Sequence, residues 1–276
     1  MPSLPVNGCR LHYEITGEGS ETLMFSHGLL FSTQLFDAQV TAFQKQFRIL
    51  NYDHRGQGQS APSQTPFDMD QLYSDAATLI EQLGIGPVHF VGLSMGGFVG
   101  MRLAARRPDL IKSLTLIATS AETEKSKFKY FLLNLLVRLF GVKAVTKRVM
   151  PILFGKTFLK DSIRQPERQH WQKRLEKNEK HIVKSVDAVI FRNDIAGELN
   201  KIECPTLILV GDEDVATPLS RAKFMASRIQ SSELKIIDHA GHSAVIEQPE
   251  QCNQAINEFL NKLHQCGEAS LKRAAV

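Results

Sequence analysis

A single serine stands among glycines in the stretch HFVGLSMGGFVG, residues 89–100. Ser94 follows an apolar, β-branched run and precedes a stretch with helical character. The pattern G-x-S-x-G at such a junction, here from Gly92 to Gly96, predicts a sharp turn that exposes the serine hydroxyl. We expect these two positions to be glycine because the strand and the helix approach each other too closely there for side chains. The chemistry expected of such a serine is nucleophilic attack on an acyl group.

A serine hydroxyl needs a base to take its proton, and the base needs an acid to orient it. His242, in HAGHSAVIEQPE, lies between the last expected strand and the last expected helix. Asp214, in LVGDEDVATP, follows the preceding expected strand. Both positions are loops at the carboxyl ends of strands, where open α/β sheets place their ligands. We therefore expect Ser94, Asp214 and His242 to meet.

Other acidic and histidine side chains compete for these roles. Asp212 and Glu213 are the alternatives to Asp214 in the chain order Ser, Asp, His. The remaining histidines considered have structural interpretations, at a strand end, in a loop and within a strand: His239, His54 and His89. The spacing of His239 and His242 without carboxylate or cysteine partners does not indicate a metal site. Four scattered cysteines without a C-x-x-C pair indicate neither zinc nor disulfides.

Acyl transfer also needs donors for the oxyanion that forms in the transition state. The stretch FSHGLL places His27 and Gly28 at the end of an expected strand, and Gly28 allows the loop to fold inward. The backbone amides of Leu29 and Met95 can then face one substrate oxygen. This chemistry needs no metal and no organic cofactor.

Strands and helices alternate along most of the chain, which predicts an α/β fold with a mostly parallel sheet covered on both faces. The expected strands cover residues 22–28, 47–53, 87–92, 111–120, 205–214 and 233–239. The expected helices cover residues 33–46, 69–84, 95–108, 219–228 and 249–264. The better alternation of segment 1–20 predicts an antiparallel hairpin at the sheet edge.

The strand rhythm stops between residues 121 and 200. This segment holds 17 Lys/Arg and 9 Asp/Glu, a net charge of +8 against +4 for the whole chain. We expect a helical cap here, inserted into a core formed by residues 1–120 and 201–276. Its bases could be a solvated helix face, could steer anionic substrates, or could dock on a membrane surface.

Composition restricts the functional class further. The 276 residues are 43% hydrophobic and 22% charged, as in ordinary globular proteins, and a net charge of +4 is too small to indicate nucleic acid binding. The N-terminus lacks a charged start followed by an apolar core, and no apolar run reaches the roughly 18–20 residues that span a bilayer. We expect a cytoplasmic protein without stable membrane insertion that acts on a small molecule. Its oligomeric state is not indicated.

Taken together, the stretches SHGLL, YDHRGQGQS, GLSMGG, GDEDVATP and AGHSAVIEQPE resemble the α/β-hydrolase superfamily in order and spacing. The resemblance covers nearly the whole chain and implies the α/β-hydrolase fold. It implies that Asp53 and Arg55 shape a loop. The family pattern G-x-x-D-x-x-x-P, from Gly211 to Pro218, favours Asp214 as the acid.

Within the superfamily, the chain is similar to serine carboxylesterases and 3-oxoadipate enol-lactonase-like hydrolases. Ser94 stands where haloalkane dehalogenases and epoxide hydrolases have aspartate. Similar carbon–carbon bond hydrolases usually carry Asn before the serine and an aromatic residue soon after the histidine, where this chain has Leu93, Ser243 and Ala244. Leu29 stands where perhydrolases usually have an aromatic residue. The implied function is hydrolysis of carboxylic esters or lactones through an acyl-enzyme. The alternatives are acyl transfer or perhydrolysis by the same triad, and a non-catalytic ligand-binding protein.

Overall fold

Eight strands form one sheet in the order β1-β2-β4-β3-β5-β6-β7-β8. A computed structural model describes residues 2–274, with side chains through residue 265. The strands from β3 onward are parallel to one another, whereas β2 is antiparallel to β1 and β4. This confirms the predicted fold class and edge hairpin. The strands are β1 (Ser3–Val6), β2 (Cys9–Thr16), β3 (Thr22–Ser26), β4 (Arg48–Tyr52), β5 (Val88–Leu93), β6 (Ile111–Ile117), β7 (Thr206–Gly211) and β8 (Ser232–Ile237).

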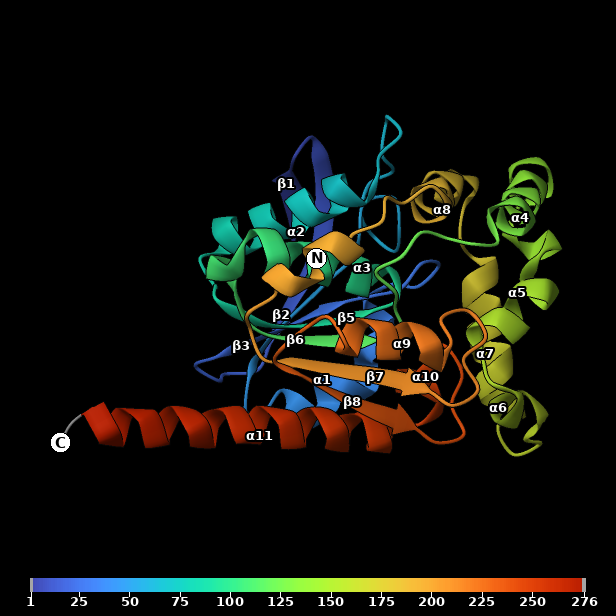
Figure 1. Cartoon of the computed structure of the whole chain (residues 1–276). Coiled ribbons are helices and arrows are strands. Elements are labelled where there is room, and N and C mark those ends of the chain that lie inside the picture. The colour runs from blue at the N-terminus through green and yellow to red at the C-terminus, as the bar shows by residue number, and fades with distance from the viewer. Residues whose placement is uncertain (1, 275–276) are drawn as a thin grey trace.

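Helices cover both faces of the sheet, and every residue of β3, β5 and β7 is buried. Figure 1 shows α2 and α3 on one face and α1 and α11 on the other. Two large apolar clusters accordingly pack on the sheet, one on each face. These helices are α1 (Asp37–Phe43), α2 (Met69–Leu83), α3 (Met95–Arg106), α9 (Leu219–Ala226), α10 (Ala244–Glu247) and α11 (Pro249–Ala274). The last of them continues ten residues past the predicted end at His264.

Local sequence signals explain where α2 begins and ends. The Asp68 carboxylate accepts the backbone N–H of Gln71 at 2.9 Å, which satisfies one of the unpaired donors of the first turn. Gly84 ends the helix with a φ of 61°, a conformation that costs glycine little. The predicted helix at 69–84 is confirmed.

Between β6 and β7 the chain forms helices without strands, and we call residues 121–200 the helical insertion. Figure 1 shows this insertion beyond the arrowheads of β7 and β8, at the carboxyl edge of the sheet. Its helices are α4 (Lys127–Phe140), α5 (Thr146–Leu153), α6 (Lys156–Lys160), α7 (Gln165–Glu176) and α8 (Val183–Ile190). Short 3-10 helices lie both outside and inside this insertion: η1 (Thr33–Phe36), η2 (Pro108–Leu110), η3 (Val142–Ala144), η4 (Lys180–Ile182) and η5 (Ala196–Lys201). Within residues 2–274, no helix combines the length and apolarity needed to cross a membrane.

Two glycines bring β5, α3 and β3 into close contact. A Cβ on Gly96 would lie 1.9 Å from the backbone oxygen of Ser26. A Cβ on Gly92 would lie 2.4 Å from the backbone carbonyl of Gly96. Both obstacles are backbone atoms, so neither can be relieved by a side-chain rotation. This explains the glycine pattern that flanks Ser94.

We expect Gly96→Ala to destabilise the protein by about 3 kcal/mol or more, because overpacking against backbone forces the helix away from the strand. Urea unfolding followed by circular dichroism measures the change. Gly197→Ala is the matched control, because a Cβ there meets nothing within 4 Å. Equal stability of the two variants would contradict this account of the contact.

Candidate active site

Ser94 occupies the turn between β5 and α3 in a strained backbone conformation, with φ 52° and ψ −108°. Its backbone N–H donates to the carbonyl of Ile117 at 2.8 Å, and its carbonyl accepts the Thr119 hydroxyl at 2.8 Å. A strained backbone conformation persists only when the surrounding structure stabilises it, and these two hydrogen bonds do so at Ser94. The serine is only half-buried, at the carboxyl edge of the sheet.

Asp214 and His242 face each other across the loops that follow β7 and β8. Nδ1 of His242 lies 3.0 Å and 3.2 Å from the two carboxylate oxygens of Asp214. The backbone N–H groups of Ala216 and Thr217 and the Thr217 hydroxyl also donate to this carboxylate, at 2.7–2.9 Å. The acid is therefore fully hydrogen-bonded although it is buried.

The charge on Asp214 is stabilised by these neighbours. Burial by itself would raise the pKa of the carboxyl group, but the facing His242 ring and the hydrogen bonds from His242 and Thr217 outweigh it. The pKa of Asp214 therefore lies below its ordinary value. An ionised carboxylate at Nδ1 fixes the ring orientation and favours the tautomer with the proton on Nδ1.

The competing acids have other partners. Asp212 accepts the N–H of Ala240 at 3.2 Å, and Glu213 binds the backbone N–H and the hydroxyl of Thr157 at 2.8 Å and 2.6 Å. His239 is exposed, with a φ of 57°. Of the three candidate acids, Asp214 is the one whose carboxylate contacts His242.

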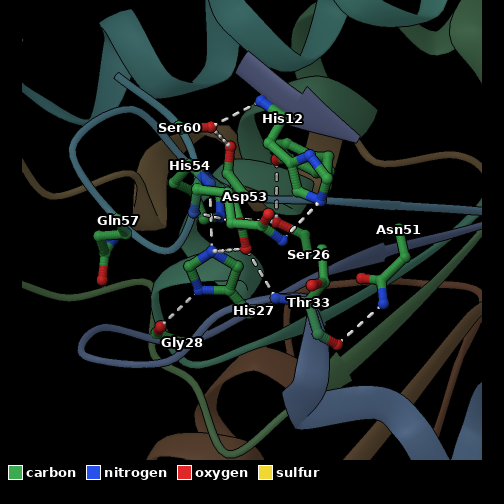
Figure 2. Close-up of polar contacts among 12 residues, drawn as sticks. His12, Ser26, His27, Gly28, Thr33, Asn51, Asp53, His54, Gln57 and Ser60 are labelled. Atoms are coloured by element: carbon green, nitrogen blue, oxygen red, sulfur yellow. Dashed lines mark hydrogen bonds and ion pairs between the residues drawn. The ribbon is translucent and has the colours of Figure 1, made fainter. Parts of the chain in front are cut away.

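A buried polar network lies behind the loop that follows β3 (Figure 2). Nδ1 of His27 donates to the carbonyl of Gly28 at 2.8 Å, and Nε2 accepts the backbone N–H of His54 at 3.1 Å. A ring that accepts at Nε2 is neutral. Burial, which outweighs the nearby Asp53 carboxylate, lowers the pKa of His27 and keeps it so.

This network orients the amide of Leu29. In a trans peptide the C=O and N–H point in opposite directions. Since the Gly28 carbonyl points toward His27, the N–H of Leu29 points away from the network. The N–H of Met95 is among the first in α3 and has no intrahelical partner. Both are thus backbone donors near Ser94.

A cavity of about 140 Å³ joins these elements. Ser94, His242 and Thr217 line it, as do Gly28 and Leu29. Most of its remaining wall is apolar and comes from the helical insertion, including Leu133, Val137, Val145, Val149, Ile152, Ile182 and Val186. An apolar cavity with a few polar groups at one point is typical of a small-molecule site.

The family model of the alpha/beta hydrolase fold matches residues 21–249, most of the chain. The chain belongs to the α/β-hydrolase family. The hydrolase is 26% identical to 3-oxoadipate enol-lactonase 2 of Acinetobacter baylyi, over 95% of this chain and 97% of that protein. It is 28% identical to RutD of a Caulobacter species, a protein named for carbamate hydrolysis, over 95% and 98%. The enol-lactonase structure from Burkholderia xenovorans matches with a TM-score of 0.89 and 28% identity, over 94% of this chain and all of that one.

The hydrolase also uses residues that the sequence analysis missed. Leu30 has a φ of 71°, and its N–H donates to Oε1 of buried Gln57 at 2.8 Å. The side-chain amide nitrogen Nε2 of Gln57 lies 3.6 Å from the sulfur of Met95. From the helical insertion, Asn178 donates to the Leu30 carbonyl at 2.9 Å. The Leu29–Leu30 segment is thus held from both sides. The only sequence signal was the position of Gln57 inside the DHRGQGQS motif.

Asp53 and Arg55 have the structural roles expected of them. The Asp53 carboxylate accepts the backbone N–H groups of Thr33 and Gln59, each at 2.7 Å. Arg55 forms a buried two-point ion pair with Asp75, at 2.5 Å and 2.6 Å. Both residues fix loops around the site, and neither lines the cavity.

Among the residues whose side chains are described, one group has the geometry for a metal ion, namely Glu21, His89 and His264. It lies at the amino ends of the strands, opposite Ser94, and Glu21 already binds the Lys112 ammonium group. Nδ1 of His89 bonds Ser113 at 2.8 Å. Within the cluster, Nε2 of His89 and Nε2 of His264 hydrogen-bond the Glu21 carboxylate at 3.0 Å and 2.7 Å. Cys9, Cys204 and Cys252 are free thiols, and Cys266 lies outside the described side chains.

Glu247 links the His242 loop to the helical insertion. One of its carboxylate oxygens accepts the N–H of Gly241 at 3.0 Å and that of Gly155 at 2.8 Å. Burial, only partly offset by these bonds, raises the pKa of Glu247 to about 7. Between about pH 4.5 and 7 the carboxyl group therefore ionises in the unfolded chain but not in the folded one. Its contribution to stability is present below this window and is lost as the pH rises.

Ionisation of Glu247 should lower the free energy of unfolding of the wild type by about 3 kcal/mol between pH 4.5 and 7.5. We expect this decrease to be absent from Glu247→Gln. Urea unfolding at a series of pH values measures it. Glu250→Gln, at an exposed glutamate at the start of α11, is the control and should leave the pH dependence intact. A Glu247→Gln profile with the wild-type slope would contradict the assignment.

Proposed function

We propose that this hydrolase cleaves carboxylic esters, or lactones, with Ser94 as nucleophile, His242 as base and Asp214 as the orienting acid. The observation that carries the proposal is the bond between Asp214 and Nδ1 of His242, beside a cavity that His242 and Ser94 both line. The strained turn at Ser94 adds support, because such strain is concentrated at functional positions.

In the proposed mechanism, Asp214 holds Nδ1 of the His242 ring and leaves Nε2 able to accept a proton. Ser94 Oγ attacks the acyl carbon while its proton passes to Nε2, and Asp214 stabilises the resulting imidazolium without taking the proton. The imidazolium then protonates the leaving alkoxide, which departs and leaves the acyl group on Ser94. Water, deprotonated by the same ring, attacks the acyl-enzyme and releases the acid and the free serine.

The amides of Leu29 and Met95 are proposed as the donors to the oxyanion. The orientation of the Gly28–Leu29 peptide by His27 and the position of Met95 at the start of α3 support this role. A neutral His27 is compatible with this role, because a second positive charge near the site would disfavour formation of the imidazolium of His242. One such donor typically contributes about 10²–10³ in turnover.

We propose that residues 121–200 act as a cap that selects the substrate, over a core of residues 1–120 and 201–276. The apolar side chains that the insertion contributes to the cavity support an uncharged acyl or ring group. The relatives named as enol-lactonases favour a lactone as the second candidate substrate. In a lactone the leaving alkoxide stays attached to the acyl group, so the same steps open the ring.

Ser94→Ala should lower turnover by about 10⁶, because the nucleophile is lost. The measurement is a p-nitrophenyl ester series from acetate to laurate, with a set of lactones in parallel, together with fluorophosphonate labelling. Ser126→Ala, at an exposed serine, serves as control. Labelling that persists in Ser94→Ala would sink the assignment, and the ratio of kcat/KM for esters and lactones decides between the two substrates.

Gln57→Ala should lower kcat by about 10- to 100-fold with little change in KM, because the loop that carries the Leu29 amide loses its anchor. Gln59→Ala is the matched control in the same loop, since the Gln59 side chain is exposed and bonds only His12 among the described residues. Steady-state kinetics on the best ester measures both. A raised KM with normal kcat would show that Gln57 acts on substrate binding instead.

A further inference from the structure

Helix α4 has two apolar faces. Tyr130, Leu133, Asn134 and Val137 point inward and line the cavity. The opposite face is exposed to solvent and consists of large apolar side chains: Phe128, Phe131, Leu132, Leu135 and Leu139, with Phe140 at the helix end. Phe128 is 75% exposed and Leu139 is 57% exposed. A helix at the surface of a globular protein normally turns polar residues outward.

The spacing of the exposed residues places them in one stripe. Positions 128, 131, 132, 135 and 139 follow the i, i+3, i+4, i+7 and i+11 pattern of one helix face. In Figure 1 α4 lies at the outer edge of the molecule, on the side away from the sheet. Contiguous exposed apolar surface of this kind marks an interaction site. We call these five residues and Phe140 the α4 stripe.

The chain segment that carries the α4 stripe is basic. Residues 125–148 contain seven Lys and Arg and no Asp or Glu. All seven bases are exposed. Among the side chains that the structure describes, one of the seven forms an ion pair, Arg138 with Asp187 of α8. Most of the positive charge of this segment is thus uncompensated by the protein.

We propose that the α4 stripe docks on the surface of an anionic lipid bilayer. Such a surface offers the two properties that match this face, an apolar interior below a layer of negative headgroups. The stripe would lie at the boundary between headgroups and acyl chains, with Lys127 and Lys129 at the lipid phosphates. A second copy of the chain matches less well, because it would bring the same positive charge. A nucleic acid would leave the stripe in water.

This docking would act next to the catalytic cavity, because the inner face of α4 forms part of the cavity wall. Molecules that partition into the lipid would then meet the protein at the helix that borders its cavity. The docking itself does not depend on catalysis, so a Ser94→Ala protein should bind lipid as the wild type does. Failure of the proposed chemistry and failure of the docking are thereby distinguishable.

The test is flotation with vesicles of phosphatidylcholine alone and of phosphatidylcholine with 30% phosphatidylglycerol, at low and high salt. We expect binding to the anionic vesicles that weakens as salt is raised. Phe128→Ser with Phe131→Ser should weaken it about tenfold or more, through the lost apolar contact. The matched control is Ile163→Ser, an 86% exposed apolar residue of the insertion outside the stripe, which should bind normally.

Charge is tested separately by Lys127→Glu with Lys129→Glu, which should weaken binding about 30-fold or more. Lys223→Glu, at an exposed base in α9, is the control. Thermal unfolding of all variants checks the fold. Absence of binding to anionic vesicles, or equal effects of stripe and control variants, would overturn the proposal. Self-association that requires the stripe, without lipid binding, would overturn it in favour of a second copy.

Discussion

The contact between β3, β5 and the start of α3 is the constraint on which the site depends. Because a Cβ at Gly96 would lie 1.9 Å from the Ser26 backbone oxygen, helix and strand can meet only through glycine. Their approach forces the intervening Ser94 to a φ of 52° and raises it at the carboxyl edge of the sheet. The same geometry brings the first amides of α3 to that edge, where their partial positive charge favours an anion.

Hydrogen bonds between uncharged groups connect this contact to the loop after β3. Ser26, the residue that Gly96 touches, shares its hydroxyl with Tyr52 and with Nε2 of His54, each at 3.0 Å. The backbone of His54 in turn donates to His27, which holds the Gly28 carbonyl. Burial lowers the pKa of both histidines, so both rings are neutral. They can therefore position the loop by hydrogen bonds without adding a positive charge near the site.

The sequence predicted those features that depend on local pattern. Buried strands read as continuous apolar runs, and the glycine spacing around Ser94 reflects a contact between elements adjacent in the chain. Chain order also brought Asp214 and His242 forward as candidates, although choosing Asp214 over Asp212 needed a family resemblance. Gln57 and Asn178 could not be found in this way, because they meet Leu30 across 27 and 148 positions. Nor did the apolar composition of α4 reveal that one of its faces is exposed.

The helical insertion is attached to the core by different kinds of contact along its length. Its α6 end is fastened to the core, since Glu213 binds Thr157 and Glu247 binds Gly155. The side chains of α4, in contrast, bond within the insertion, where Asn134 donates to Val183 and Asp187 of α8. Val137 of α4 also belongs to an apolar cluster that packs against Leu29 and Leu30 of the core. Helix α4 therefore meets the loop after β3 through apolar contacts, whereas the α6 end meets the loops after β7 and β8 through hydrogen bonds.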